Sequence, residues 1–250
     1  MNLFNQFLAE MPKETRLVLY GRFGTIMHVV MFAVLLLLML RRFQNKKNVF
    51  RLLFSFYVAF YAGNMACNVL GNLTHNLIPK INLGVAFFFF LLVSTFLLWL
   101  LKAPVRQSLD IAVPVFILGR GVGIIGCLFP GCCHGFPAAW GIYSNHAGTT
   151  VVPTVLFDIL LSFVIVVYLL LSKKKLLTPG AIAARGILLF GVLRYVVDVL
   201  RDNNKLFLMV TTEGICGMIY VLIGLFLLYL IENNKLQEHL VKAEDNLDSI

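Results

Sequence analysis

The sequence predicts an all-α integral membrane protein with seven transmembrane helices, an N-terminus outside the membrane and a cytoplasmic C-terminus. The first observation is composition: hydrophobic residues make up 60% and charged residues 13% of the 250 residues, whereas soluble domains carry about 25% charged residues. The second is a mean hydropathy of +0.88, concentrated in apolar runs that reach the roughly 20 residues needed to cross a bilayer. The third is an uneven distribution of basic residues between the connections.

Seven apolar ranges are predicted to span the membrane. They are residues 17–40, 49–73, 81–101, 108–128, 151–171, 180–200 and 207–231. We therefore expect one seven-helix membrane domain over residues 1–231 and a polar cytoplasmic tail over residues 232–250. The first 16 residues lack the basic stretch and short apolar core of a cleaved signal peptide, so the first span is expected to direct insertion.

Basic residues in alternate connections predict the orientation. The first, third and fifth connections carry ten of them: Arg41, Arg42, Lys46, Lys47, Arg51, Lys102, Arg106, Lys173, Lys174 and Lys175. The other three connections carry Lys80, Arg201 and Lys205. Because cytoplasmic loops are enriched in Lys and Arg, the first group is predicted to be cytoplasmic. The net charge of +9 then indicates contact with anionic membrane lipid rather than with nucleic acid.

Three asparagines, Asn64, Asn68 and Asn72, occur in the second span at a spacing of four residues. Residues at this spacing share one helix face. A polar face within the bilayer must look into the protein. The pattern therefore predicts hydrogen bonds between this helix and its neighbours.

Charged residues within spans are a functional signal, since each costs about 2.5–3.5 kcal/mol to insert. Arg194, Asp198 and Arg201 follow one another at i, i+4 and i+7, on one face of the sixth span. Asp198 is expected to pair with either arginine. Such a triad can lock helices together or bind an anion. Two arginines for one carboxylate leave positive charge, which favours an anion such as phosphate.

Three more polar residues are predicted near the same side of the membrane. Arg120 lies in the fourth span, on a face that it shares with Cys127. Asp158 lies at the outer end of the fifth span and is predicted either to pair with Arg120 or Arg194 or to act directly on a substrate. Tyr20 opens the first span at the outer interface, where tyrosine is frequent.

The stretch GRGVGIIGCLFPGCCHG, residues 119–135, combines six glycines with three cysteines and a histidine. Glycines suit close helix packing and then a tight turn. Cys127, Cys132, Cys133 and His134 are the residue types of a redox or metal site. Adjacent cysteines do not readily share a tetrahedral zinc, however, and the spacing is not that of the usual zinc sites. A disulfide between the adjacent Cys132 and Cys133 would be strained, whereas one between Cys127 and Cys132 stays open. We therefore expect no metal and no cofactor.

Four segments in this order resemble the prolipoprotein diacylglyceryl transferase family, over roughly residues 15–230. Segment 123–135 is similar to the family's glycine-rich signature in a cysteine-rich version. Segment 152–158 is similar to its His-Pro-x-Gln-Leu-Tyr-Glu segment. Arg194-x-x-x-Asp198-x-x-Arg201 resembles its Arg-x-x-x-Glu-x-x-Arg motif, and Tyr20-Gly21 resembles the Tyr-Gly that opens its first span.

The resemblance implies a transferase of the bacterial cytoplasmic membrane, multi-pass, with its site towards the outer leaflet. Its reaction moves a diacylglyceryl group from phosphatidylglycerol to the lipobox cysteine of a prolipoprotein signal peptide. The implied catalytic residues are Arg194, Asp198 and His134. The implied substrate-binding residues are Arg120, Arg201, Tyr20, Asp158, Gly126, Gly131 and Gly135. The base that activates the thiol is open between His134, His146 and Asp158.

Departures from the family pattern keep a second function open. Ile124 stands where the signature has arginine, and residues 83–87 lack the family's His-Gly-Gly turn. Val152, Val155 and Phe157 replace polar residues of the second segment. The alternative is a catalytically impaired paralogue that binds anionic lipid or a lipidated peptide without transfer.

Overall fold

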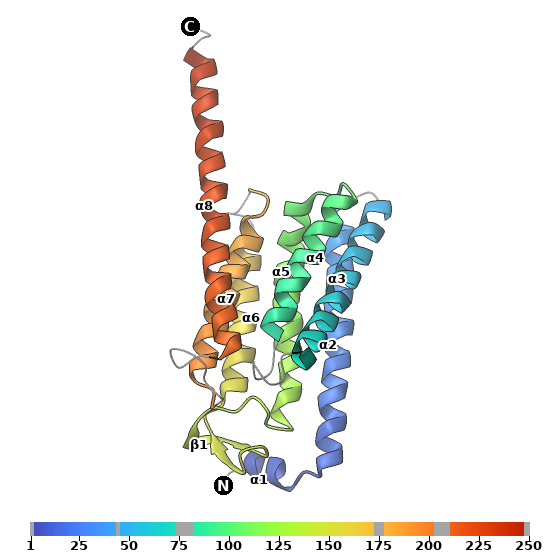
Figure 1. Cartoon of the computed structure of the whole chain (residues 1–250), viewed down its shortest axis with the longest axis vertical. Helices are drawn as coiled ribbons and strands as arrows, with labels where there is room; N and C mark the ends of the chain where they lie inside the picture. Colours follow the sequence, from blue (N-terminus) through green and yellow to red (C-terminus); the bar gives the residue numbers. More distant parts are fainter. Residues whose placement is uncertain (1–2, 44–45, 74–82, 173–177, 203–210, 248–250) are drawn as a thin grey trace.

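The structure is a computed structural model that describes residues 3–43, 46–73, 83–172, 178–202 and 211–247. Its helices are α1 (Leu3–Glu10), α2 (Lys13–Arg42), α3 (Lys46–Leu73), α4 (Leu83–Leu100), α5 (Val105–Ile125), α6 (Thr154–Ser172), α7 (Ala181–Val199) and α8 (Thr212–Leu247). A 3₁₀ turn, η1 (Gly126–Leu128), extends α5, and two strands, β1 (Pro137–Ser144) and β2 (Thr149–Val151), follow it. The long helices form an upright bundle with the chain termini at opposite ends (Figure 1).

A helix occupies most of each of the seven predicted ranges, so the helical fold class is confirmed. Helices α2, α3, α5, α6 and α8 are long and apolar enough to cross a membrane. Helix α4 contributes a shorter apolar segment, Gly84–Leu100, and α7 carries three charged residues within its length. Five candidate spans are therefore established among the described residues, and the full count of seven stays a prediction.

Residues 137–151, at the connection between the predicted fourth and fifth spans, form an antiparallel hairpin that was not predicted. The pairs Tyr143↔Thr150 and Ser144↔Thr149 set its register. Helix α1 packs on β1, because Asn5 donates to the Gly141 carbonyl at 3.3 Å and accepts from the Tyr143 amide at 3.0 Å. The side-chain amide of Asn5 thus acts as an extra peptide group at the edge of the hairpin. Helix α1 and the hairpin cover the N-terminal end of the bundle (Figure 1).

Aromatic side chains fill the centre of the bundle. Phe87 of α4 lies with its ring centroid 4.4 Å from that of Phe116 in α5, 4.9 Å from Phe190 in α7 and 5.3 Å from Tyr220 in α8. The Tyr220 hydroxyl donates to the carbonyl of Gly84. In a bilayer, helices associate through packing and hydrogen bonds rather than through hydrophobic burial. This cluster therefore ties α4, α5, α7 and α8 into one unit.

Helices α7 and α8 approach each other at two glycines. A Cβ added at Gly191 would lie 2.6 Å from the Gly217 carbonyl oxygen, and one at Gly217 would lie 2.8 Å from the Gly191 carbonyl oxygen. Only residues without a side chain permit this backbone contact. The contact brings the start of α8, with Glu213, beside the end of α7, with Arg194.

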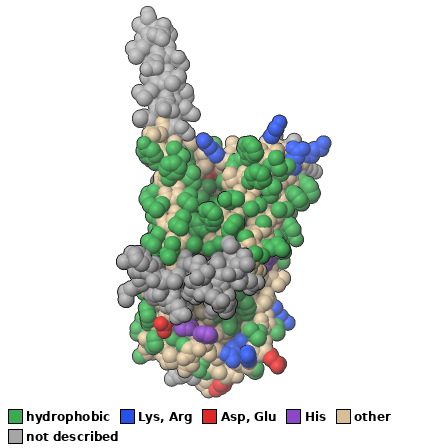
Figure 2. Space-filling model, viewed as in Figure 1, with side chains coloured by type: hydrophobic (Ala, Val, Ile, Leu, Met, Phe, Trp, Pro, Cys, Tyr) green, Lys and Arg blue, Asp and Glu red, His purple; other side chains and the backbone are tan. Residues whose placement is uncertain are grey.

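The surface of the bundle is divided by chemistry along its length. Figure 2 shows hydrophobic side chains over the upper half of the bundle, with Lys and Arg at its upper edge. At the lower end, Lys, Arg, Asp, Glu and His side chains lie among hydrophobic side chains and the atoms of other residues and the backbone (Figure 2). The N-terminal end of the bundle is thus the chemically more diverse one.

Candidate functional site

Asp158, near the start of α6, is the centre of a buried ion cluster at the N-terminal end of the bundle. Its Oδ2 accepts hydrogen bonds from Arg120 at 3.1 Å, Arg194 at 2.9 Å and Arg201 at 3.2 Å. The carboxylate is fully buried. The predicted pairing of Asp158 with Arg120 or Arg194 is confirmed, since both pairs form at once.

Glu213, in the first turn of α8, is the second carboxylate of the cluster. Its Oε2 accepts from Arg201 at 3.1 Å and also pairs with Arg194. Arg194 and Arg201 therefore each bridge Asp158 and Glu213. Removing one member of a buried ion pair leaves the other charge uncompensated, so the five side chains depend on one another.

Guanidinium groups outnumber the carboxylates that touch them in this cluster, three to two. The Nε atoms of Arg120, Arg194 and Arg201 are buried and have no hydrogen-bond acceptor among the described residues. A buried donor without an acceptor costs free energy. The cluster can therefore accommodate a further acceptor, and an anion suits three arginines best.

Asp198 does not have the partners predicted from its spacing. Among the described residues it forms no ion pair with an arginine. Its Oδ1 accepts from the Thr211 hydroxyl at 2.6 Å and its Oδ2 from the Thr211 amide at 2.8 Å. Thr211 in turn caps α8, because its hydroxyl accepts from the Glu213 amide at 3.1 Å. Asp198 thus fixes the start of α8, and with it the position of Glu213.

A cavity of about 410 Å³ opens beside the cluster, between α2, α3 and α5. Its polar lining residues are Tyr20, His28, Tyr61, Asn64, Arg120 and Cys127, and the rest are apolar or glycine. The side chain of Arg120 is 11% exposed, against 1% for Arg194 and 4% for Arg201. Arg120 is therefore the arginine that joins the ion cluster to the cavity.

The asparagines of α3 do not show the predicted hydrogen bonds to neighbouring helices among the described residues. Asn64 lines the cavity and donates within its own helix, to the Phe60 carbonyl at 2.9 Å, so the expected interhelical bond is not the one that forms. Asn68 is exposed. The side chain of Asn72 lies outside the described residues.

His28 of α2 also lines the cavity, although no sequence pattern singles it out. Its Nδ1 lies 2.5 Å from the Gly24 carbonyl oxygen. A carbonyl oxygen only accepts, so Nδ1 carries the proton, and Nε2 of the neutral ring is left as an acceptor. The ring packs against Phe60 with centroids 5.0 Å apart. His28 thus brings a fixed proton acceptor to the same cavity as Arg120.

His134 lies in the turn after η1, and it is not one of the described residues that line this cavity. Its ring centroid is 5.4 Å from that of His146, and its carbonyl accepts from the Asp202 amide at 3.2 Å. The neighbouring Gly135 forms a β-bridge with Arg201. The backbone of this turn therefore holds the end of α7 in place.

The three glycines predicted to bind substrate lie at close packing contacts. Gly131 has a φ of +69°, and a Cβ there would lie 2.6 Å from the Ser144 Oγ of β1. A Cβ at Gly135 would lie 2.7 Å from the Cβ of Val152, and one at Gly126 would lie 3.1 Å from the Cβ of Phe23. These contacts fix the turn against the hairpin and α2. Contact of the glycines with substrate stays a prediction.

The cysteines of the turn also interact. Contacts with the thiols of Cys127 and Cys132 hold the pKa of Cys133 well below its ordinary value. The positive charges of Arg201 and Arg120 lower the pKa further, against the effect of burial.

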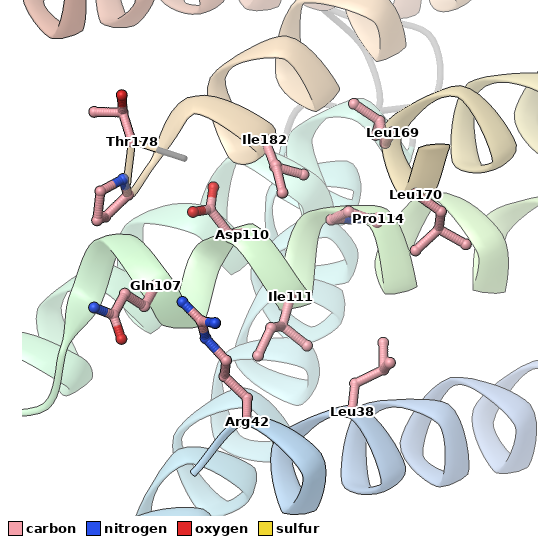
Figure 3. Close-up of a pocket in the computed structure, with 11 residues that line it drawn as sticks. Leu38, Arg42, Gln107, Asp110, Ile111, Pro114, Leu169, Leu170, Thr178 and Ile182 are labelled. Atoms are coloured by element: carbon pink, nitrogen blue, oxygen red, sulfur yellow. The ribbon is translucent and has the colours of Figure 1, made fainter. Parts of the chain in front are cut away.

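A second cavity, of about 140 Å³, lies at the opposite end of the bundle between α2, α5, α6 and the start of α7. Asp110 points towards the start of α7, and the Arg42 side chain extends towards it across the cavity (Figure 3). The two oxygens of Asp110 accept from the amides of Gly180 at 2.7 Å and Ala183 at 2.8 Å. Asp110 is thus the cap of α7, supplied by another helix.

These features define a helical membrane protein in which a buried, arginine-rich cluster opens on a largely apolar cavity. Residues 25–230 match the family model described as prolipoprotein diacylglyceryl transferase. The match extends over most of the sequence, and the chain belongs to this family.

Relatives of the same description occur in several bacteria. A phosphatidylglycerol–prolipoprotein diacylglyceryl transferase of Dehalococcoides mccartyi is 32% identical over 130 residues, covering 48% of this chain and 50% of the relative. One of Clostridium tetani is 31% identical over 134 residues, covering 49% and 52%. A second transferase of Clostridium perfringens is 32% identical over 148 residues, covering 54% and 55%. The aligned part of the chain spans about half the length of these relatives.

Proposed function

We propose that this protein transfers the diacylglyceryl group of phosphatidylglycerol to the lipobox cysteine of a prolipoprotein, as the names of its relatives describe for them. The observation that carries the proposal is Arg120, which lines a largely apolar cavity and is at the same time part of the arginine cluster. Acyl chains suit an apolar cavity. The phosphate of the same lipid suits the guanidinium at its wall.

In this reaction the substrate thiolate attacks the glyceryl carbon that carries the phosphate ester, a C–S bond forms and a C–O bond breaks. Glycerol phosphate leaves with the bonding electrons. Negative charge therefore grows on the phosphate oxygens, and donors that are already in place stabilise it most effectively. Arg120 takes this role directly. Arg194 and Arg201 support it by fixing Asp158, which holds Arg120 through Oδ2.

The thiol must lose its proton, since the thiolate is the nucleophile. We assign the base to His28, because its ring lines the same cavity as Arg120 and its Nε2 is free to accept. His134 is the second candidate. Asp158 is a poor one, because its Oδ2 already accepts from three guanidinium groups.

The proposed topology has seven spans, the N-terminus outside and the tail from residue 232 in the cytoplasm. The described helix ends that flank the basic connections support it: the C-terminal ends of α2, α4 and α6 and the N-terminal ends of α3, α5 and α7 all lie at the end of the bundle from which α8 extends (Figure 1). The ion cluster and the larger cavity lie at the other end. The site would then face the outer leaflet, where prolipoproteins emerge from translocation.

The experiment is complementation of a bacterial strain depleted of its own transferase, with a reporter prolipoprotein whose thioether-linked lipid shifts its mobility on a gel. Expression of the wild-type chain should restore the shift. A matched Arg194→Ala variant, inserted at the same level, should lose it. Unchanged labelling in the variant would contradict the assigned role of the cluster.

The catalytically impaired paralogue remains the second candidate function, and one observation favours it. Ile124, at the position of the signature arginine, is fully buried in an apolar cluster with Cys127 and Val155. The side chain at this position carries no charge, so it cannot pair with a phosphate as an arginine would. A wild-type chain that inserts normally but leaves the reporter unlabelled would support a lipid-binding role without transfer.

A further inference from the structure

Three cysteine sulfur atoms converge at the end of α5. Cys127 belongs to η1, and Cys132 and Cys133 belong to the turn that follows. Their Sγ atoms all lie within 4.8 Å of one another, and those of Cys132 and Cys133 are 3.9 Å apart. The transfer reaction as derived from Arg120 and His28 makes no use of this group, which we call the cysteine triad.

The Sγ separation of Cys132 and Cys133 is compatible with two ligands of one metal ion and is too long for a disulfide. A bonded pair of sulfurs lies about 2.05 Å apart. Sulfurs that share a metal at about 2.3 Å lie about 3.8–4.0 Å from one another, in tetrahedral or trigonal geometry. The Cys132–Cys133 separation of 3.9 Å falls in this range.

The backbone holds the triad in a defined shape. The Gly131 amide donates to the Cys127 carbonyl at 3.0 Å, and the left-handed φ of Gly131, +69°, turns the chain back. The Thr154 hydroxyl donates to the Cys133 carbonyl at 2.6 Å. Ser144 of β1 closes the turn by donating to the Gly131 carbonyl at 3.0 Å. A turn fixed at three points keeps the sulfurs together without requiring a metal to fold it.

The surroundings suit a thiolate-bound metal. Three thiolates around Zn²⁺ carry a net charge of −1, and around Cu⁺ a net charge of −2. Arg120 lines the same cavity as Cys127 and can balance that charge. Cys127 is buried, Cys133 is intermediate and Cys132 is exposed, so an ion can enter from the side of Cys132.

We propose that Cys127, Cys132 and Cys133 bind one thiophilic, closed-shell cation, Zn²⁺ or Cu⁺, through three thiolates, with release of the thiol protons to solvent. Zn²⁺ would take a fourth ligand such as water, whereas Cu⁺ is selected by the softness of the thiolates. This inference departs from the expectation of no metal, which rested on the spacing of the cysteines in the sequence. The turn brings together sulfurs that the spacing alone does not.

The test uses the full-length protein, purified in detergent and kept reduced with a phosphine. It is incubated in separate arms with Zn²⁺ alone and with Cu⁺ alone, challenged with a chelator, desalted and analysed for metal. The two triad variants are Cys132→Ser and Cys133→Ser. Because Cys132 is exposed, its replacement is the less disruptive of the two for folding. The matched control is Cys216→Ser, at a cysteine of α8 that lies beside Gly84 of α4. Gel filtration and melting temperature compare the folding of all four proteins.

We expect the wild type and Cys216→Ser to retain about one ion per chain in one of the two arms, and each triad variant to bind at least about tenfold more weakly. The arm that retains metal identifies the ion. Equal retention by Cys132→Ser and the wild type would overturn the proposal. So would a reduced wild type that retains neither ion.

Discussion

Asp158 and Asp110 are carboxylates at opposite ends of the bundle, and their hydrogen bonds are of different kinds. Both oxygens of Asp110 accept from backbone amides at the start of α7. Asp158 accepts from three arginines through Oδ2 alone, and its buried Oδ1 has no partner among the described residues. The amide donors of Asp110 are fully used, whereas the arginines of Asp158 retain unused donors.

This difference separates a structural carboxylate from one that belongs to a site. A carboxylate at a helix N-terminus completes the local hydrogen bonding and meets the positive end of the helix dipole. An excess of guanidinium groups next to a cavity of about 410 Å³ leaves room for a ligand. The end with Asp110 has the smaller cavity, of about 140 Å³, and no comparable cluster of ion pairs among the described residues.

Asp158→Ala and Asp110→Ala, at the two ends of the bundle, should lower the free energy of unfolding by different amounts. We expect the free energy of unfolding to fall by about 3–5 kcal/mol for Asp158→Ala, because three buried guanidinium groups lose their common partner. Asp110→Ala should cost about 1 kcal/mol, the usual value of a helix cap. Denaturant unfolding in detergent measures both. Similar losses at the two positions would refute the distinction.

His28→Gln should lower the rate of transfer about 100-fold if His28 is the base, with the free energy of unfolding little changed. His134→Gln provides the comparison within the same end of the bundle. The reporter assay in membranes, with time points, gives both rates. A larger loss of transfer rate in His134→Gln than in His28→Gln would assign the role of base to His134 instead.

Thr211→Val removes a hydroxyl that donates to Asp198. A buried carboxylate that loses a partner should destabilise the protein by about 1–3 kcal/mol. Ser108→Ala is the control at the opposite end, where the hydroxyl donates to the Pro104 carbonyl at 2.8 Å, and it should cost about 1 kcal/mol. Thermal melting in detergent ranks the two variants. The reverse order would show that Asp198 does not depend on Thr211.

The seven helical ranges could be predicted because each is marked by a long apolar run. The hairpin could not, because β1 and β2 lie in a segment without regular alternation of apolar and polar residues. The ion pairs of Asp158 could be anticipated, since an unpaired charge is too costly within a membrane. Charge alone, however, did not indicate that Oδ2 would accept from all three arginines.

Two interaction partners, Glu213 and Thr211, could not be predicted from the sequence because their contacts join segments that are distant in the chain. Glu213 reaches Arg194 only because Gly191 and Gly217 let α7 and α8 touch. Asp198 meets Thr211 for the same reason, and helical spacing within α7 pointed to an arginine instead. His28 is a single histidine in an apolar helix, and only the cavity reveals its neighbours.

The most direct test of the central claim is the lipid preference of Arg120→Gln. Purified proteins are mixed with labelled phosphatidylglycerol and challenged with phosphatidylcholine, whose headgroup is zwitterionic. The wild type should prefer phosphatidylglycerol about tenfold, the effect of a charge-assisted hydrogen bond of roughly 1.5 kcal/mol. Arg120→Gln should lose this preference, and Arg42→Gln, at the opposite end, should keep it. A preference that survives in Arg120→Gln and disappears in Arg42→Gln would contradict the account.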